Sequence, residues 1–175
     1  METAQVQTVV QESAQLVRSE MADKGIELGI DSDPDVLPFA FDQAKTAVVI
    51  DCNLREPGLH SLVDVAPEYG LTDFLDDPDF DVASILYPTG IPRLRLIPAG
   101  SRREVPAEFF TSFRMKQFVQ AVRRRYPDRF IIFDTAPISD SPDARILGEL
   151  CDYAMLVVPH GRVSPTTAEQ AALAF

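Results

Sequence analysis

Two aspartates stand where buried strands are predicted to end, and they are the first candidates for chemistry in this chain. Asp51 closes the apolar run AVVID, and Asp134 closes the run FIIFD. Apolar runs without polar alternation are typical of strands in a parallel sheet that helices cover on both faces. Ligands of open α/β sheets bind at the carboxyl ends of the strands. We therefore expect Asp51 and Asp134 to lie together at one edge as candidate catalytic or binding groups.

A structural role is the alternative for both aspartates. A carboxylate at the end of a strand can accept hydrogen bonds from N–H groups of the loop that follows, and it then acts as a cap. The sequence alone leaves both roles open.

The elements that must position these residues alternate between strands and helices. We predict strands at 26–30, 47–51, 93–98, 130–134 and 153–158, and helices at 2–21, 38–45, 59–63, 106–125, 141–150 and from 164, with two short helices within 69–86. This alternation predicts an α/β fold with a mainly parallel sheet and helices on both faces. We expect one domain over residues 1–175, with an amphipathic helix in 1–25 and the core in 47–175.

The composition bounds the class of protein. The chain has 175 residues, 46% of them hydrophobic, which is enough to build one core. Its 27 acids and 16 bases give a net charge of −11, which disfavours nonspecific binding to nucleic acid or to an anionic membrane surface. The basic cluster at 123–125 is explained by the favourable position of cations at a helix C-terminus. Cys52 and Cys151 lack metal-type spacing, so we expect reduced thiols in a cytosolic protein.

Four blocks occur in one order along the chain: VVIDCNLREPGLH, GLTDFL, LIPAGSRREVPAEFF and FIIFDTAPISDSPDA. Together they resemble the cytoplasmic domain of the bacterial tyrosine autokinases (BY-kinases), which regulate capsule and exopolysaccharide export and are relatives of the ParA and MinD ATPases. The resemblance runs from about Ala47 to about Pro165 and implies a P-loop NTPase-like fold.

The resemblance implies roles for the residues of the first and last blocks, which correspond to Walker A′ and Walker B. Asp51 would lie near a magnesium ion and the incoming hydroxyl, and Asp134 would hold the metal through water. Both would then be catalytic residues and metal ligands, because phosphoryl transfer depends on positioning and on charge neutralisation by a hard cation. Asn53 stands where the family usually has a second acid, and Arg55 would face phosphate or a neighbouring subunit.

A polar stripe on the predicted N-terminal helix resembles a further family motif. Glu12, Gln15 and Arg18 stand three residues apart, like the Glu-x-x-Arg-x-x-Arg oligomerisation motif with its middle arginine replaced. They could pair with a neighbouring chain, and a solvated surface is the alternative.

The resemblance breaks down before the central strand, at residues 26–46. BY-kinases carry a Walker A loop, Gly-x-Gly-Lys-Ser/Thr, between their first strand and first helix, whereas the loop here reads DSDPDVLP at 31–38. It lacks glycine for close approach of the backbone to phosphate and lysine to neutralise it. Asp31, Asp33 and Asp35 would each repel a triphosphate by about 1 kcal/mol. We expect an altered P-loop region, and vestigial roles for Asp51 and Asp134.

These features predict a degenerate relative that acts as a non-catalytic scaffold or regulator in exopolysaccharide or capsule biosynthesis, with no bound cofactor. Its partners would be a membrane polysaccharide co-polymerase, kinase subunits or a second copy, with no nucleic acid and no direct insertion into the membrane. It would be cytoplasmic and recruited to the inner face of the plasma membrane. The alternative is an active tyrosine kinase or ATPase that uses Mg-ATP. A MinD- or ParA-type positioning ATPase fits less well, because LIPAGSRREVPAEFF resembles the kinases more closely.

Overall fold

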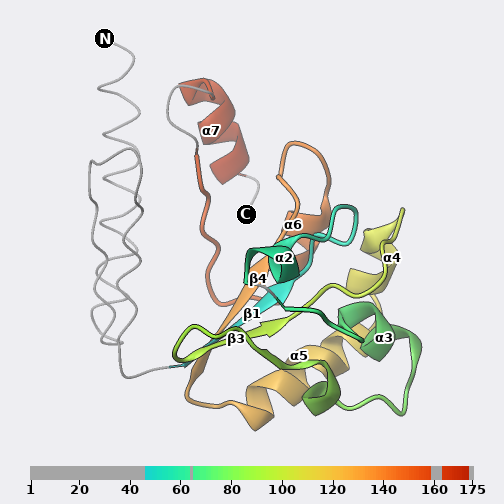
Figure 1. The fold of residues 1–175 in the computed structure, drawn as a ribbon. Coiled ribbons are helices and arrows are strands. Elements are labelled where there is room, and N and C mark those ends of the chain that lie inside the picture. Colours follow the sequence, from blue (N-terminus) through green and yellow to red (C-terminus); the bar gives the residue numbers. More distant parts are fainter. Residues whose placement is uncertain (1–45, 64, 159–162, 174–175) are drawn as a thin grey trace. The chain divides into compact units, whose positions relative to one another are not determined.

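The computed structural model describes residues 46–63, 65–158 and 163–173 (Figure 1). Residues 46–154 form one compact unit, and the described residues from 155 onward, with helix α7 (Pro165–Ala172), belong to another. The elements predicted before residue 46, and the stripe Glu12, Gln15 and Arg18, lie outside the described residues. The expectation of a single domain stays a prediction.

A four-stranded sheet organises the first unit. Its strands are β1 (Thr46–Asp51), β2 (Tyr87–Pro88), β3 (Leu94–Ile97) and β4 (Arg129–Asp134), in the order β2-β3-β1-β4. Strand β1 runs parallel to both β3 and β4, and only the two-residue β2 is antiparallel. The mixed α/β class with a mainly parallel sheet is therefore confirmed, although β2 was not predicted.

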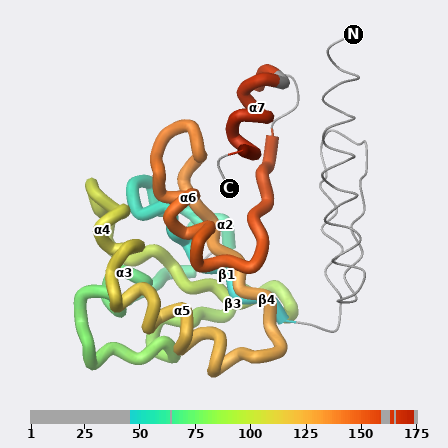
Figure 2. Tube along the Cα trace, turned by 180° about the vertical axis from the view of Figure 1, so that it is seen from behind, coloured from blue at the N-terminus to red at the C-terminus, as the bar shows by residue number. Residues whose placement is uncertain are grey.

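Helices pack on the sheet face that carries Val48 and Ile50. The elements that contribute core residues there are α3 (Leu71–Asp76), the 3-10 helix η1 (Val82–Ile85), α4 (Pro106–Phe110), α5 (Phe113–Arg125) and α6 (Asp143–Gly148), whereas α2 (Leu59–Leu62) has no buried residue. Helix α5 lies along this face (Figure 2), and Phe118 and Val122 join Val48 and Ile50 in the core. Each of these side chains stabilises the fold by about 1.5–3 kcal/mol through burial.

The predicted helix 106–125 is interrupted, so that prediction was wrong about continuity. Helix α4 ends at Phe110, where the hydroxyl of Thr111 donates to the carbonyl of Ala107 at 2.9 Å. Ser112 then has an extended backbone and accepts from the N–H of Met115 at 3.0 Å, so it is the N-cap of α5. Ser and Thr favour such local bonds over helix interior, which explains the break.

The predicted strand 153–158 is not formed. These residues have no regular structure, and Met155 and Val157 are 59% and 58% exposed. Their apolar run resembles a buried strand, but a strand forms only where another strand accepts its hydrogen bonds.

A close backbone contact joins α3 to the loop after β3. The N–H groups of Leu71 and Thr72 donate to the carbonyls of Pro98 and Ala99 at 2.7 and 2.9 Å. A Cβ added at Gly70 would lie 2.5 Å from the carbonyl oxygen of Pro98 and 2.6 Å from the Cα of Gly100. Both neighbours are backbone atoms, so they cannot rotate away.

We expect Gly70→Ala to lower the free energy of unfolding by about 3 kcal/mol, because the backbone must move apart to admit a methyl group. Denaturant unfolding measures this loss. The control is Gly58→Ala, since a Cβ there meets one atom, the carbonyl oxygen of Glu56 at 3.9 Å. Equal stabilities of the two variants would contradict the prediction.

Candidate functional site

Asp51 is completely buried at the end of β1, and its carboxylate holds the loop that follows. Oδ1 accepts from the N–H of Asn53 at 3.1 Å. Oδ2 accepts from the N–H groups of Gly58 and Leu59 at 3.1 and 3.2 Å. Both oxygens are therefore occupied by backbone donors, and the geometry is that of a loop cap.

Asp134 lies beside Asp51, as the sequence predicted, because the two residues are register partners across β1 and β4. The N–H of Cys52 donates to the backbone carbonyl of Asp134 at 2.7 Å. Asp134 is exposed, and nearby protein atoms remove part of the water around its carboxylate. This partial desolvation, with the charge of Asp51, raises the pKa of Asp134 above its usual range.

Cys52 lies between the strand and the loop and is fully buried. Burial, followed by the charges of Asp51 and Asp134, raises the pKa of its thiol well above the usual value. A neutral thiol is a poor nucleophile and a poor metal ligand. Cys52 and Cys151 are both free, as predicted.

Asn53 and Arg55 are bound to protein atoms of this chain. Asn53 Oδ1 accepts from the N–H of Glu56 at 3.3 Å. Arg55 Nη1 donates to the carbonyl of Glu104 at 2.7 Å, and its Nε donates to Asp143 Oδ2 at 3.3 Å. Arg55 therefore ties the β1 loop to the loop before α4 and to the start of α6.

Asp143 is a site residue that the sequence did not single out. Its side chain is 1% exposed, and Oδ1 has no hydrogen-bond partner among the described residues, while Oδ2 pairs with Arg55. An acid just after Ser141 and Pro142 looks like an ordinary first-turn residue of a helix. Its ion pair with Arg55 spans 88 positions of sequence, so no local signal could have found it.

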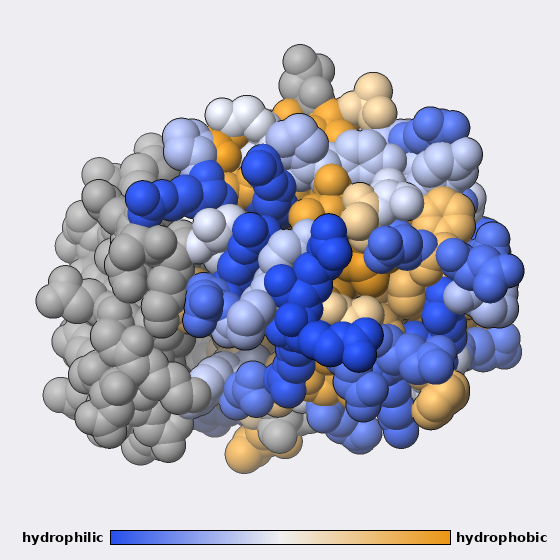
Figure 3. All heavy atoms as spheres, turned by 90° about the horizontal axis from the view of Figure 1, so that it is seen from below, coloured by the Kyte–Doolittle hydropathy of each residue, from blue (hydrophilic) through white to orange (hydrophobic). Residues whose placement is uncertain are grey.

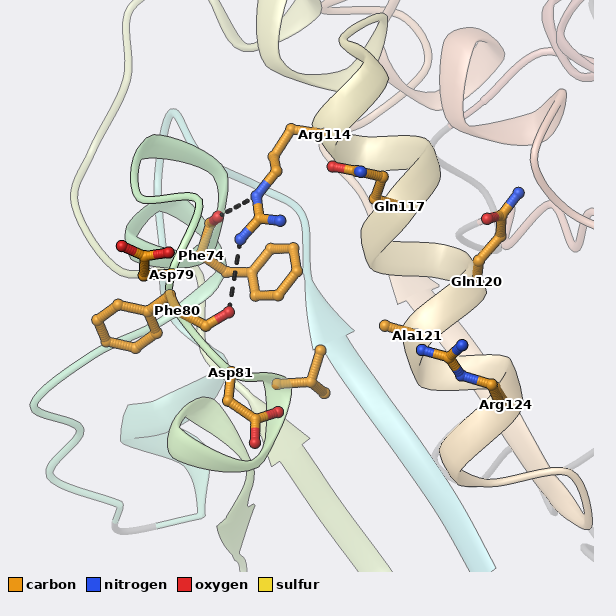
Figure 4. A pocket seen from close by; sticks show the side chains of 10 residues that line it. Phe74, Asp79, Phe80, Asp81, Arg114, Gln117, Gln120, Ala121 and Arg124 are labelled. Atoms are coloured by element: carbon orange, nitrogen blue, oxygen red, sulfur yellow. Dashed lines mark hydrogen bonds between the residues drawn. The ribbon is translucent and has the colours of Figure 1, made fainter.

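One of the two expected metal ligands is engaged with protein atoms in the described part of the chain. No three side chains of His, Cys, Asp or Glu within the described ranges lie close enough to share a metal ion. Asp51, the expected ligand, has both oxygens occupied. A hollow of about 590 Å³ lies elsewhere, between α5 and residues 79–82 (Figure 4), where Arg114 stacks 3.9 Å from the ring centre of Phe74 and closes one end.

The chain is similar to bacterial tyrosine-protein kinases. It is 32% identical over 132 residues to the tyrosine-protein kinase YwqD of Bacillus subtilis, and the match covers 75% of this chain and 53% of YwqD. It is 30% identical over 102 residues to the tyrosine-protein kinase CpsD of Streptococcus agalactiae, covering 58% of this chain and 43% of CpsD. The succinoglycan biosynthesis transport protein ExoP of Rhizobium meliloti is 27% identical over 126 residues, 67% of this chain and 15% of ExoP. No family model matches.

The fold is similar to solved kinase domains. The crystal structure of the VpsO kinase domain matches with a TM-score of 0.68 at 22% identity, over 74% of this chain and 63% of that one. The chain is thus a relative of the BY-kinases, as its four sequence blocks indicated, and it spans about half the length of YwqD and CpsD. Within the described ranges, no helix combines the length and apolar character needed to cross a bilayer.

We expect Asp51→Asn to lower the free energy of unfolding by about 2 kcal/mol, because the amide replaces one acceptor oxygen with a donor that faces backbone N–H groups. Denaturant unfolding measures this loss. Asp128→Asn, the same change at an exposed residue, should stay within about 0.5 kcal/mol of wild type. A stable Asp51→Asn protein would show that the cap is dispensable.

Asp134→Asn should instead raise the melting temperature at neutral pH. The folded state disfavours the ionised carboxylate, since burial and the charge of Asp51 raise the pKa of Asp134 above its ordinary value of 3.8. Wild type therefore gains stability relative to the variant as the pH falls through that raised pKa. The difference in melting temperature disappears as the pH approaches the pKa that Asp134 has in the unfolded chain. Thermal melts across this pH range test the sign, and a variant that melts below wild type at neutral pH would reverse it.

Proposed function

We propose that this relative of the BY-kinases is a non-catalytic scaffold or regulator of exopolysaccharide or capsule biosynthesis. One observation carries the proposal: the Asp51 carboxylate is fully buried and accepts three backbone hydrogen bonds. A fully buried carboxylate that uses three of its roughly four acceptor positions to hold a loop is poorly placed to bind a metal ion or to accept a hydroxyl proton. Asp51, which would hold the metal ion of a phosphoryl-transfer site, stabilises the loop after β1 instead.

The sequence before β1 supports the same proposal. The chain contains no Gly-x-Gly-Lys-Ser/Thr loop, and backbone amides with a lysine are what such a loop supplies to phosphates. Arg55, the nearest cation to the cap along the chain, is already paired with Asp143 and with the carbonyl of Glu104. Nothing that neutralises a triphosphate is left in this loop.

The proposed partners are a membrane polysaccharide co-polymerase or active kinase subunits, with the chain in the cytoplasm at the inner face of the plasma membrane. The polysaccharide context comes from ExoP, whose name places it in succinoglycan biosynthesis and transport. The relation to YwqD and CpsD supports kinase subunits as partners. A second copy of the chain is a further candidate, through the predicted stripe Glu12, Gln15 and Arg18.

The alternative is an active Mg-ATP-dependent tyrosine kinase or ATPase whose phosphate loop is supplied unconventionally. Asp134 is the observation that favours it, because this carboxylate lies beside Asp51 and is exposed. A raised pKa is also a common property of catalytic carboxylates.

Calorimetric titration of the full chain with Mg-ATP distinguishes the two functions. We expect no saturable binding below about 1 mM, because the site lacks cation and amide donors for phosphate. We also expect phosphoryl transfer to a tyrosine peptide to be equal, at background, in wild type and in Asp134→Asn, a variant that leaves the Asp51 cap intact. Micromolar binding, or transfer that Asp134→Asn abolishes, would establish the alternative.

A further inference from the structure

Five arginines that form no ion pair within the described part of the chain gather at the end of the sheet opposite Asp51. Arg55, Arg102, Arg103 and Arg123 each form an ion pair with an acid. No described carboxylate forms an ion pair with the five, which are Arg93, Arg95, Arg124, Arg125 and Arg129. Of the described arginines without an ion pair, Arg114 and Arg145 lie elsewhere and these five lie together, in a chain of net charge −11.

The strands place these arginines on one side of the molecule. Ile97 and Ile131 pack against α5, and residues two apart in a strand point to the same face, so Arg95 and Arg129 share that face. Arg93 immediately precedes β3 and lies next to the start of β1, since its carbonyl accepts from the N–H of Ala47 at 2.9 Å.

Helix α5 ends at the same end of the sheet and adds the remaining two arginines, Arg124 and Arg125. Arg125 and Arg129 lie 5.8 and 4.2 Å from the ring centre of Tyr126, and Arg124 precedes them on the helix. We call the five arginines with Tyr126 the arginine face. Figure 3, the view from below, shows strongly hydrophilic side chains lying side by side at this end of the molecule.

An apolar side chain projects next to the arginine face. Ile91 is 51% exposed and is the first residue of a turn in which the N–H of Leu94 donates to the carbonyl of Ile91 at 3.2 Å. Thr89 Oγ1 accepts from the N–H of Ile91 and donates to the carbonyl of Leu94, at 3.2 and 3.1 Å. Arg93 completes the turn with a φ of 64°, a left-handed conformation that non-glycine residues rarely adopt. The turn is therefore held firmly with Ile91 outward.

Nearby acids offset part of the positive charge. Asp79 and Asp81 line the hollow of Figure 4 together with Arg124, and Asp128 is exposed in the turn before β4. The face keeps an excess of positive charge. Charges farther away than the Debye length, about 8 Å at physiological ionic strength, are largely screened. The net charge of the whole chain therefore does not decide what this face binds.

We propose that the arginine face docks on the surface of a bilayer that contains anionic phospholipid. Arginine, tyrosine and one projecting isoleucine suit that surface, because headgroup phosphates meet the cations while the apolar interior below accepts Ile91. An acidic peptide or a nucleic acid would use the arginines but gives no role to an exposed isoleucine. The docking uses neither aspartate and is independent of the proposed function.

Flotation of the full chain with lipid vesicles tests the proposal. Wild type should float with vesicles that contain phosphatidylglycerol and not with pure phosphatidylcholine. Arg95→Glu with Arg125→Glu should weaken binding at least about tenfold, since each arginine near an anionic surface contributes separately. The matched control is Arg102→Glu with Arg145→Glu, which changes the charge equally at exposed residues outside the face and should bind like wild type.

Ile91→Ser provides a second variant that leaves the charge unchanged, and it should weaken vesicle binding about threefold or more. If the double glutamate variant melts at a much lower temperature than wild type, the vesicle binding of Ile91→Ser tests the proposal in its place. Failure of wild type to float with anionic vesicles would overturn the proposal. So would equal binding by wild type and both face variants, or capture by polyglutamate or DNA in place of vesicles.

Discussion

The hydrogen bonds accepted by Asp51 are the constraint on which the structure at the carboxyl ends of the strands depends. One buried carboxylate fixes the chain at Asn53, Gly58 and Leu59, so the loop after β1 leaves the sheet along a defined path. That path places Arg55 where it can reach Asp143 and the carbonyl of Glu104. A buried charge is costly unless it is paired or hydrogen-bonded, so the loop and the aspartate each stabilise the other.

The sequence was informative where structure is set by strong local patterns. The apolar runs before Asp51 and Asp134 predicted two parallel strands and the meeting of the two acids, because continuous apolar runs have few alternative folds. Thr111 and Ser112 were missed, since a two-residue break inside a helical pattern is decided by side-chain bonds to the backbone. Strand β2 has only two residues and exists because β3 pairs with it.

Non-local pairing explains the remaining differences. The apolar residues Met155 and Val157 are exposed although their run predicted a strand, because a run of this kind says nothing about where its partner strand lies. The role of Asp143 could not be predicted for the same reason, because its partner Arg55 is far away in sequence. Charge at the two ends of the sheet is likewise a property of the fold, with acids where β1 and β4 end and arginines where they begin.

The Asp51 cap also bears on how sequence motifs should be interpreted. If the same carboxylate is needed for folding, selection for a stable chain preserves it after catalysis is lost, together with the loop residues whose N–H groups it holds. A protein can then keep a Walker A′-like signature for many generations without turnover. Searches that infer activity from that signature alone would group working kinases with inert relatives, and the phosphate-binding loop is the feature that separates them.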